Sequence, residues 1–555
     1  MIGDDIAKLV HDAIARAQAI GALPTFGIPP IPIGHPKQEG HGDWATPICM
    51  QLTGVAKLPP LRIAEIVVAH LDQAGPVGRV DIAKPGFINF TLSESWLGEQ
   101  VDVILQAGPG YGDLDLGLGR SVQVEFISAN PTGPLHIGSA RNAAIGDALA
   151  NVLAAAGYQV QREYYVNDAG TQMEVFGATL YARYAQALGR DEAVPEGGYQ
   201  GTYMVEMGQR AAVEVGSRCL DMDRSQAIRE MTDLGLKYMV QSIQADARLM
   251  GIHFDRWFSE RSLYEEGVFE QVMAILRAGS HVIERDGAIW FEATELGDSK
   301  DEVLVRSNGA PGYFASDIAY HYDKFVRRGF DWVIDVWGAD HQGHVPRMHA
   351  MMRALGLEPK RLSIILYQLV TLKRKGEVVR LSKRTGEIIT LREVLEEVGA
   401  DAVRFFLVSR SADSQMDFDL DLAKEQSSEN PVYYIQYAHA RICSILRLAA
   451  EKGLLDSGGD VGLLTHPMEL ALIRRLLNFP EVVRVAATDL APHHLAYYAQ
   501  DLASQFHLFY RDCRVVSGEP GEQEISKARL KLARAAQAVL AKSLHLMGMT
   551  APEQM

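Results

Sequence analysis

Two short segments of this 555-residue chain combine residue types that suit phosphate chemistry. The first, 128–139, reads Ser-Ala-Asn-Pro-Thr-Gly-Pro-Leu-His-Ile-Gly-Ser and precedes a run rich in Ala, Leu and Ile. If that run is a helix, its first N–H groups lack internal partners and attract a phosphate. His136 would donate to an oxygen that gains charge during phosphoryl displacement, and Gly138 would let the ligand approach the backbone. The alternative interpretation is a capped helix with a buried histidine.

The second segment, 380–386, reads Arg-Leu-Ser-Lys-Arg-Thr-Gly and follows a basic turn at 373–375. Cations grouped around a Ser and a Gly are suited to clamp a polyphosphate. Charged runs of this kind are more often solvated loops, so these residues alone leave both interpretations open.

The elements around the first segment predict a parallel nucleotide-binding unit. Apolar strands are expected at 122–127 and 159–166, with a Pro/Gly loop at 130–134 and a helix over 136–153 between them. A strand, a loop, a helix and a second strand in this order form the parallel βαβ unit. Polar residues just after its second strand, Asn167, Asp168 and Gln172, either shape a pocket or form an Asx-turn and helix cap.

The length predicts several domains, because a single core rarely grows past roughly 250–300 residues. The fold class expected is α/β. A small α/β N-terminal domain covers 1–115, and a Rossmann-type parallel-sheet catalytic domain covers 116–398. A mainly helical insertion occupies about 170–300, and an all-α domain covers 399–555. Two further strands are expected to complete the catalytic sheet, at 332–336 and 364–370.

Composition excludes several classes of protein. The net charge of −16 argues against non-specific adhesion to RNA, so any RNA contact should be local. No two of the four cysteines form a CxxC pair, which predicts a reduced, cytoplasmic protein without a Cys-based zinc site or other protein-bound metal. The first residues do not resemble a signal peptide, and no run of 18 apolar residues predicts a membrane span.

Taken together, the two segments resemble the signature pair of class I aminoacyl-tRNA synthetases, the His-x-Gly-His and Lys-Met-Ser-Lys motifs. They lie about 240 residues apart. Ser139 stands in place of the second histidine of the first motif, and Arg380 and Leu381 stand in place of Lys and Met in the second. Four further positions agree with the motifs: His136, Gly138, Ser382 and Lys383.

The surrounding sequence narrows this resemblance to the arginyl-tRNA synthetase family. The similarity spans nearly the whole chain, and its segments are 125–138, 166–172, 306–309, 313–317, 338–341, 399–406, 430–441 and 551–555, with 41–43 and 86–90 in the N-terminal domain. The resemblance implies that the chain activates arginine with ATP, releasing pyrophosphate, and transfers arginine to the 3′-terminal adenosine of tRNA(Arg). It implies attack by the 2′-OH, bound tRNA before activation, Mg²⁺ with the ATP, no tightly bound prosthetic group, and a monomer.

The same resemblance assigns residues to the substrates. A guanidinium offers five N–H donors in one plane and favours carboxylates, so Glu125 and Asp317 are expected to bind arginine, with Tyr313 against the plane. Asn130 would hold the α-amino group. Asp340 would take ribose hydroxyls or the substrate amine. The alternative for Asp317 and Asp340 is a helix or turn cap. The expected ATP contacts are Pro134, His136, Gly138, Asp340, Arg380 and Lys383, and the expected catalytic residues are His136, Gly138, Ser139, Ser382 and Lys383.

The C-terminal region is expected to bind the anticodon. Aromatic and basic residues share the stretch 433–441, and unstacked RNA bases stack on such side chains. Tyr437 and Arg441 are the expected tRNA contacts. Three alternatives remain: a class I synthetase for another amino acid, a small-molecule nucleotidyltransferase, and a non-catalytic tRNA-binding paralogue. The two pocket carboxylates argue against another amino acid, and the long helical domain argues against a small-molecule nucleotidyltransferase. The intact His136 and Lys383 argue against a non-catalytic paralogue.

Overall fold

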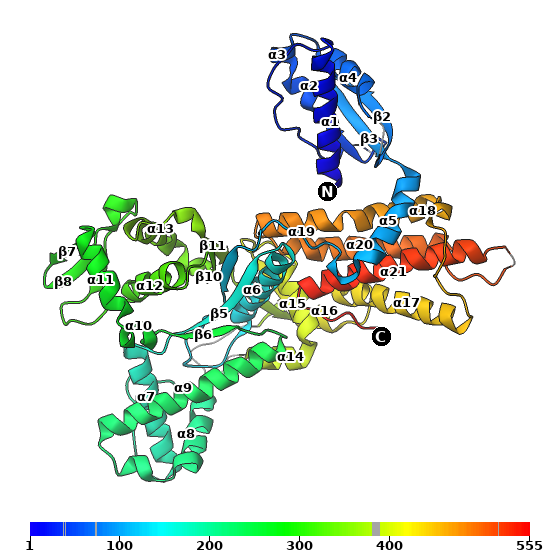
Figure 1. Cartoon of the computed structure of the whole chain (residues 1–555). Coiled ribbons are helices and arrows are strands. Elements are labelled where there is room, and N and C mark those ends of the chain that lie inside the picture. Colours follow the sequence, from blue (N-terminus) through cyan, green and yellow to red (C-terminus); the bar gives the residue numbers. More distant parts are fainter. Residues whose placement is uncertain (37, 39, 73–74, 380–388, 520) are drawn as a thin grey trace.

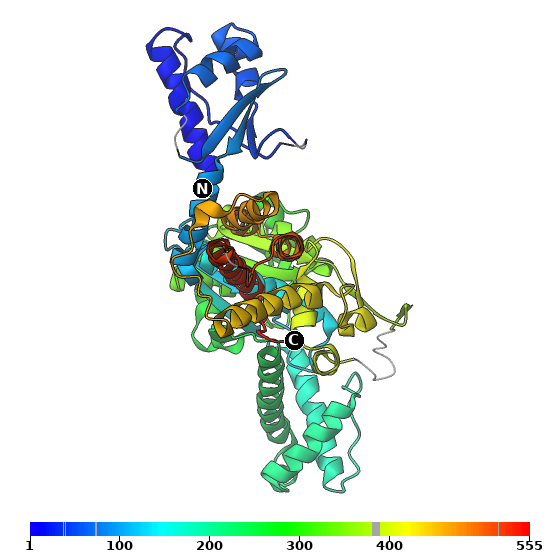
Figure 2. The same ribbon diagram turned by 90° about the vertical axis from the view of Figure 1, so that its right-hand side faces the viewer.

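The structure, a computed structural model, describes residues 1–36, 38, 40–72, 75–379, 389–519 and 521–555. A small N-terminal domain, a central body built on a parallel sheet, and a C-terminal helical bundle follow one another along the chain (Figure 1). The N-terminal domain and a helical insertion project from opposite ends of the body (Figure 2). The α/β fold class expected from the sequence is confirmed.

The N-terminal domain packs helices on one antiparallel sheet of strand order β1–β3–β2. Its apolar side chains form a separate core, in which Ile6, Val10, Ile63 and Phe90 are fully buried. The main elements are α1 (Ile2–Ala19), β1 (Trp44–Thr46), α4 (Pro60–Ala69), β2 (Val77–Ala83) and β3 (Phe87–Leu92).

The body contains a parallel sheet of order β11–β10–β4–β5–β6. The strands are β4 (Ser121–Glu125), β5 (Gln159–Val166), β6 (Arg256–Ser259), β10 (Trp332–Gly338) and β11 (Leu362–Tyr367). The chain passes from β4 to β5 on one side, whereas β10 lies on the other side of β4. Ligands bind at such a switch point, outside the carboxyl ends of the strands.

Helix α6 (Ile137–Ala155) connects β4 to β5 and is buried along almost its whole length. Because Ala, Leu and Ile occupy most of its positions, it can pack on every side. The sheet, α15 (Ala400–Val408) and α19 (Phe479–Thr488) surround it.

Two insertions interrupt the sheet, where the sequence predicts a single one over about 170–300. The first is a helical unit with its own core, built from α7 (Thr171–Ala187), α8 (Thr202–Val215) and α9 (Arg224–Leu249). The chain then returns to the sheet as β6, whose four residues are too short to show a period. The second insertion contains α10 (Arg261–Glu265), α11 (Val268–Ala278), a sheet of β7 (Val282–Arg285), β8 (Ala288–Phe291) and β9 (Glu302–Val305), and α12 (Tyr313–Tyr322).

The strand expected at 364–370 is divided in two. Strand β11 ends at Tyr367, and β12 (Val370–Arg374) joins a different sheet with β13 (Glu377–Val378) and β14 (Met416–Asp419). Strand β14 lies within 399–555, the range expected to be all-α. Helix α14 (Leu391–Val398) leads into α15.

The chain ends in a bundle of α17 (Pro431–Glu451), α18 (Pro467–Leu477), α19, α20 (His493–Asp512) and α21 (Gln523–Leu546). Helix α5 (Glu94–Ala107) links the N-terminal domain to the body and packs on α18 and α21. It therefore lies with the bundle, although it falls within the range 1–115 expected for the N-terminal domain.

Candidate active site

The loop that follows β4 is held in an unusual backbone conformation. Ile127 and Ser128 have φ values of 66° and 42°, a left-handed region that costs energy for residues with a side chain, above all a β-branched one. Hydrogen bonds hold it there. The buried Asn142 accepts from the Ile127 N–H (2.6 Å) and donates to the Val336 carbonyl (2.8 Å), so it joins this loop to β10. Ser128 Oγ accepts from the Tyr165 N–H (3.1 Å).

His136 caps α6. The Gly138 N–H donates to His136 Nδ1 (3.1 Å), and the ring is exposed at the carboxyl edge of the sheet. Because Nδ1 accepts, the neutral imidazole carries its proton on Nε2 and can donate from there. A Cβ at Gly138 would lie 2.9 Å from the ring, so Gly138 is needed for this pose. The structure thus shows a capped helix whose histidine is exposed rather than buried.

The chain that leaves the second motif returns to the first. Arg380, Ser382 and Lys383 lie outside the described residues. Just after them, Thr390 forms an antiparallel bridge with His136, and the Leu391 N–H donates to the Leu135 carbonyl (2.7 Å). Thr390 and Leu391, which follow the second motif in sequence, therefore contact the first motif at the N-terminus of α6.

Acidic side chains form a row across the sheet. In the parallel ladder Asp335 of β10 pairs with Glu125 of β4, which pairs with Glu163 of β5. Residues in register on neighbouring strands point to the same face. All three are buried, and Arg328 forms an ion pair with Glu163.

Lys324, fully buried at the end of α12, neutralises part of this row. Its Nζ donates to Glu125 Oε2 (2.6 Å) and to Asp335 Oδ1 (2.9 Å), and His321 Nε2 lies 2.9 Å from Asp335 Oδ2. Burial opposes ionisation of Asp335, but Lys324 and His321 hold its pKa well below the usual range. Burial raises the pKa of Glu125, against the attraction of Lys324. One oxygen of Glu125, an expected arginine ligand, is thus already paired.

Asp317 lies one turn before His321 on α12. Burial raises its pKa to about 7; His321 opposes this, while Glu260, Glu125 and Asp335 add to it. Within the described part of the chain its carboxylate has no hydrogen-bond or ion-pair partner. A desolvated carboxylate among other carboxylates is a site that lacks a cation.

Glu260 is a pocket residue that the sequence did not single out. It is 6% exposed and follows β6, and burial raises its pKa. The sequence does not predict its position, because that depends on the pairing of β6 with β5 in the sheet. The pocket therefore contains a third carboxylate beside Glu125 and Asp317.

The remaining expected ligands follow β4 or β10 in the chain or begin α12. Tyr313, at the start of α12 and four residues before Asp317, is 70% exposed. Asn130 Nδ2 donates to Gln172 Oε1 (2.9 Å), which orients both amides. Asp340, in the turn after β10, is exposed and lies 3.6 Å from His341 Nε2. Pro134 is half-buried and Ser139 is buried in the first turn of α6.

Asp168 has a structural role. It is buried, and its carboxylate accepts from Ser259 Oγ (2.6 Å) and from the Arg261 N–H (2.9 Å). This ties the end of β5 to the end of β6. These are contacts between segments far apart in the sequence, so neither an Asx-turn nor the N-cap of α7, which is Gly170, describes them.

The aromatic residues of α17 form a ladder with α20. Tyr433 and Tyr437 stack at 6.0 Å, His507 stacks on Tyr437 at 6.1 Å, and the Arg441 guanidinium lies 5.3 Å from the Tyr437 ring. Tyr437 and Arg441 are half-buried. His507 was not expected from the sequence, because only the packing of α20 on α17 brings it to the ladder.

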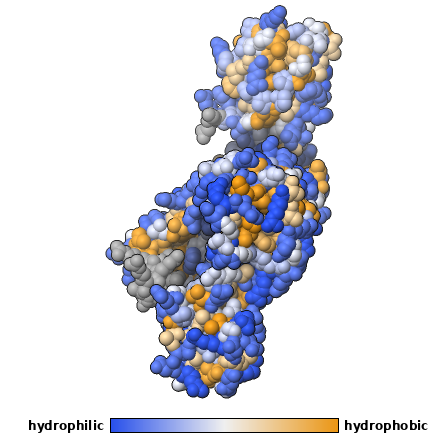
Figure 3. All heavy atoms as spheres, turned by 90° about the vertical axis from the view of Figure 1, so that its left-hand side faces the viewer, coloured by the Kyte–Doolittle hydropathy of each residue, from blue (hydrophilic) through white to orange (hydrophobic). Residues whose placement is uncertain are grey.

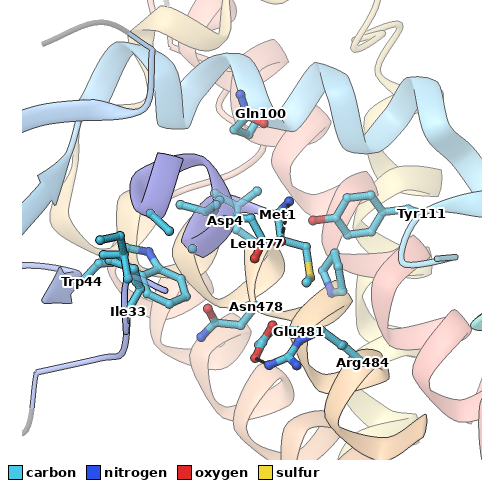
Figure 4. Close-up of a pocket in the computed structure, with 15 residues that line it drawn as sticks. Met1, Asp4, Ile33, Trp44, Gln100, Tyr111, Leu477, Asn478, Glu481 and Arg484 are labelled. Carbon is cyan, nitrogen blue, oxygen red and sulfur yellow. Dashed lines mark hydrogen bonds and ion pairs between the residues drawn. The ribbon is translucent and has the colours of Figure 1, made fainter. Parts of the chain in front are cut away.

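Other hollows lie away from this site. A cavity of about 350 Å³ separates the N-terminal domain from α19, lined by Met1, Trp44, Tyr111 and the Glu481–Arg484 pair (Figure 4). Apolar patches are scattered over a mostly hydrophilic face in Figure 3 and do not mark one RNA-binding surface there. None of the helices in the described ranges has the length and apolar character needed to cross a membrane.

A parallel sheet with a helix N-terminus at its switch point, joined to a helical bundle, is the architecture of a class I aminoacyl-tRNA synthetase. Three family models match in order: "Arginyl tRNA synthetase N terminal domain" over 4–92, "tRNA synthetases class I (R), catalytic domain" over 100–419, and "DALR anticodon binding domain" over 435–555. The chain belongs to the arginyl-tRNA synthetase family.

Curated relatives and solved structures agree with this. An arginine–tRNA ligase of Dehalococcoides mccartyi (strain CBDB1) is 52% identical over 99% of this chain and 98% of its own length. An arginine–tRNA ligase of Heliobacterium modesticaldum is 51% identical over 99% of this chain and 98% of its own length. A putative arginyl-tRNA synthetase structure from Campylobacter jejuni has a TM-score of 0.76 at 32% identity, covering 84% of this chain and 100% of that one. The Thermus thermophilus enzyme, at 24% identity and a TM-score of 0.75 over the full length of both, shows the shared fold.

Proposed function

We propose that this chain activates arginine with ATP at the carboxyl edge of the body sheet and transfers it to tRNA(Arg). The observation that supports this proposal is the group of acidic side chains at the carboxyl ends of β4 and β6 and on α12. Glu125 and Glu260 lie close enough to Asp317 to raise its pKa, and the Asp317 carboxylate has no hydrogen-bond or ion-pair partner among the described residues. A guanidinium supplies the missing charge and several donors at once.

The ATP step relies on placement and charge. The arginine carboxylate attacks the α-phosphate, and pyrophosphate leaves. Positioning and electrostatic stabilisation dominate such transfers. His136 and the start of α6 are proposed to stabilise the growing charge. Gly138, whose N–H is bonded to His136 Nδ1, would let the nucleotide approach the backbone, and Ser139 packs in the same turn. Arg380, Ser382 and Lys383 are proposed to clamp the polyphosphate, Pro134 to pack on the nucleotide, and Asp340 to bind its ribose.

Arginine is proposed to lie with its guanidinium against Asp317 and the second oxygen of Glu125. Tyr313, exposed and one turn away on α12, can cover the guanidinium plane. Asn130 binds the α-amino group, and its bond to Gln172 holds it in place.

The second step transfers arginine to the terminal adenosine of tRNA. We propose attack by the 2′-OH, and activation that requires bound tRNA. The ladder at Tyr437 and Arg441 would stack anticodon bases. The proposed domains are an N-terminal tRNA-contacting domain to about 115, a catalytic domain to about 398 and an anticodon-binding domain beyond. The enzyme is proposed to act as a cytoplasmic monomer.

Mg²⁺ is proposed to enter with ATP as part of the substrate. Among the residues that the structure describes, no group of three or more His, Cys, Asp or Glu side chains is placed to hold a metal ion. The ATP phosphates and water would therefore supply most of its ligands.

The test is ATP–pyrophosphate exchange with purified protein, each amino acid in turn, with and without tRNA(Arg). We expect exchange only with arginine and only when tRNA is present. Exchange with another amino acid would mean a different specificity, and a complete lack of exchange would favour a non-catalytic tRNA-binding protein.

Asp317→Asn tests the pocket. Citrulline nearly matches arginine in shape but lacks the charge, and leaving a buried charge unpaired costs about 3–5 kcal/mol. The wild type should therefore prefer arginine by roughly 10²–10⁴ in kcat/KM, and the variant should lose most of that preference. Asp168→Asn, which changes a structural carboxylate, is the matched control. An unchanged preference in Asp317→Asn would assign the guanidinium to other residues.

A further inference from the structure

Helix α9 belongs to two hydrophobic cores. Its first four turns supply Met231 and Tyr238 to the core of the helical insertion, and its last turns supply Ile243 and Ala247 to the core of the body. A continuous helix of 26 residues is about 39 Å long. It therefore links the insertion rigidly to the body.

The first turn of α14 is where the chain emerges from the second motif. A capping box fixes this turn, because Glu393 Oε2 accepts from the Thr390 N–H (2.7 Å) and the Glu393 N–H donates to Thr390 Oγ1 (3.2 Å). The same turn contacts the first motif through Leu135 and His136.

Arg392, in this first turn, forms an ion pair with Asp246 of α9. The Asp246 side chain is 3% exposed and that of Arg392 is 41% exposed. Burial raises the pKa of Asp246 and Arg392 lowers it, so the cation favours the charged form that makes the pair.

These contacts close a ring. The fully buried Arg404 of α15 donates to the carbonyl of Met250, just beyond α9 (2.7 Å), and pairs with Asp147 of α6. Helix α6 starts at the first motif, and the first motif contacts α14. The ion pair of Arg392 with Asp246 then connects α14 to α9. Four elements thus fix one another, and the Arg392–Asp246 pair is the link at the second motif.

We propose that Arg392 is a positioning residue for the ATP step: paired with Asp246, it holds the first turn of α14, and with it Thr390 and Leu391, against Leu135 and His136 of the first motif. This rests on the proposed function. The pose of His136 is only as well defined as the position of the segment that bridges to it. Interactions made mainly in the transition state raise kcat, so loosening this attachment should lower kcat and leave substrate affinity largely intact.

The experiment compares Arg392→Gln, Asp246→Asn and the double variant in arginine-dependent ATP–pyrophosphate exchange with tRNA. We expect kcat to fall about tenfold in each, since small misplacements of catalytic groups cost up to roughly 10²-fold. KM for ATP and arginine should change less than about twofold. The double variant should be no slower than the singles, because residues that act as one unit are not additive. Arg392→Lys, which keeps the charge, should recover part of the rate.

Lys237→Gln is the matched control, because it breaks an exposed ion pair of the same helix with Glu214. It should leave kcat unchanged. A normal kcat in Arg392→Gln, additive losses in the double variant, or a change in KM alone would each overturn the proposal. An inactive wild type would instead contradict the proposed function, so the two failures are distinguishable.

Discussion

At the scale of single residues, the pocket contains carboxylates with opposite environments. Contacts with Lys324 and His321 hold the pKa of Asp335 well below its usual range, whereas burial, with Glu260, Glu125 and Asp335 nearby, raises the pKa of Asp317 to about 7. The first is a structural charge and the second is open to a ligand. A site of this kind binds a cation most tightly when its open carboxylate is ionised.

Arginine binding should therefore depend on pH near neutrality. Without ligand, Asp317 keeps a proton in the folded chain up to about pH 7, whereas in the unfolded chain it keeps one only up to about pH 3.9. Its contribution to the stability of the free protein therefore falls as pH rises from about 3.9 to 7. Bound arginine favours the carboxylate, so KM for arginine should fall about tenfold between about pH 6 and 8, as the ionised fraction grows. The measurement is KM in the exchange assay across this range.

The Asp317→Asn variant should abolish this dependence, and KM for ATP serves as the internal comparison. If KM for arginine in the wild type were flat over the range, Asp317 would be ionised throughout and already paired.

At the scale of elements, the pocket is a product of strand register. Parallel strands place three acidic residues side by side: Asp335, Glu125 and Glu163. The turn that follows α12 brings Lys324 into ion pairs with Glu125 and Asp335. The pair Lys324–Asp335 spans α12 and the sheet and so fixes the helix that carries Asp317.

Replacing Lys324 with Met should destabilise the fold by about 3–5 kcal/mol, because it leaves two buried carboxylates without their cation. The loss of unfolding free energy should be smaller at pH 5 than at pH 8. Without Lys324 the two carboxylates have raised pKa values in the folded variant, so they can take up protons as pH falls. Chemical denaturation at both pH values measures this. Arg62→Met, which breaks an exposed ion pair with Glu65, is the control and should cost about 1 kcal/mol or less. Equal losses for both variants would show that Lys324 does not neutralise the row.

The sequence predicted those features that depend on short stretches of chain. The strand at 159–166 and the loop before α6 follow from local apolar runs and from Pro and Gly, and the structure places both as expected. Glu260 and Lys324 could not be predicted, because their roles depend on β6 returning to the sheet and on the docking of α12. The break at 368–369 was missed because a single polar residue, Gln368, interrupts an otherwise apolar run, and the separate pairing of β12 with β14 is what divides the two strands.

At the scale of the whole molecule, the N-terminal domain is joined to the body through α5 and a narrow seam (Figure 2). Ile2 and Trp44 pack against both cores there, and a cavity lies between the domain and α19 (Figure 4). Arg474 of α18 crosses the seam, and its Nε donates to Asp43 Oδ1 (2.7 Å). Asp43 also accepts from the Leu92 N–H (2.7 Å), so it holds its own domain together as well.

Arg474→Gln should loosen the N-terminal domain without unfolding it. The pair is partly exposed, at 31% and 17%, so its loss should cost no more than about 1 kcal/mol. Spin labels at Glu65→Cys and Glu524→Cys would report the distance between the domain and the bundle; all four native cysteines are buried. We expect a broader distance distribution in the variant and a nearly unchanged Tm. Arg484→Gln breaks the Glu481 pair, which lies on the same seam but within α19, and should leave the distribution narrow. If Arg474→Gln also left it narrow, the apolar contacts of Ile2 and Trp44 would be what fixes the domain.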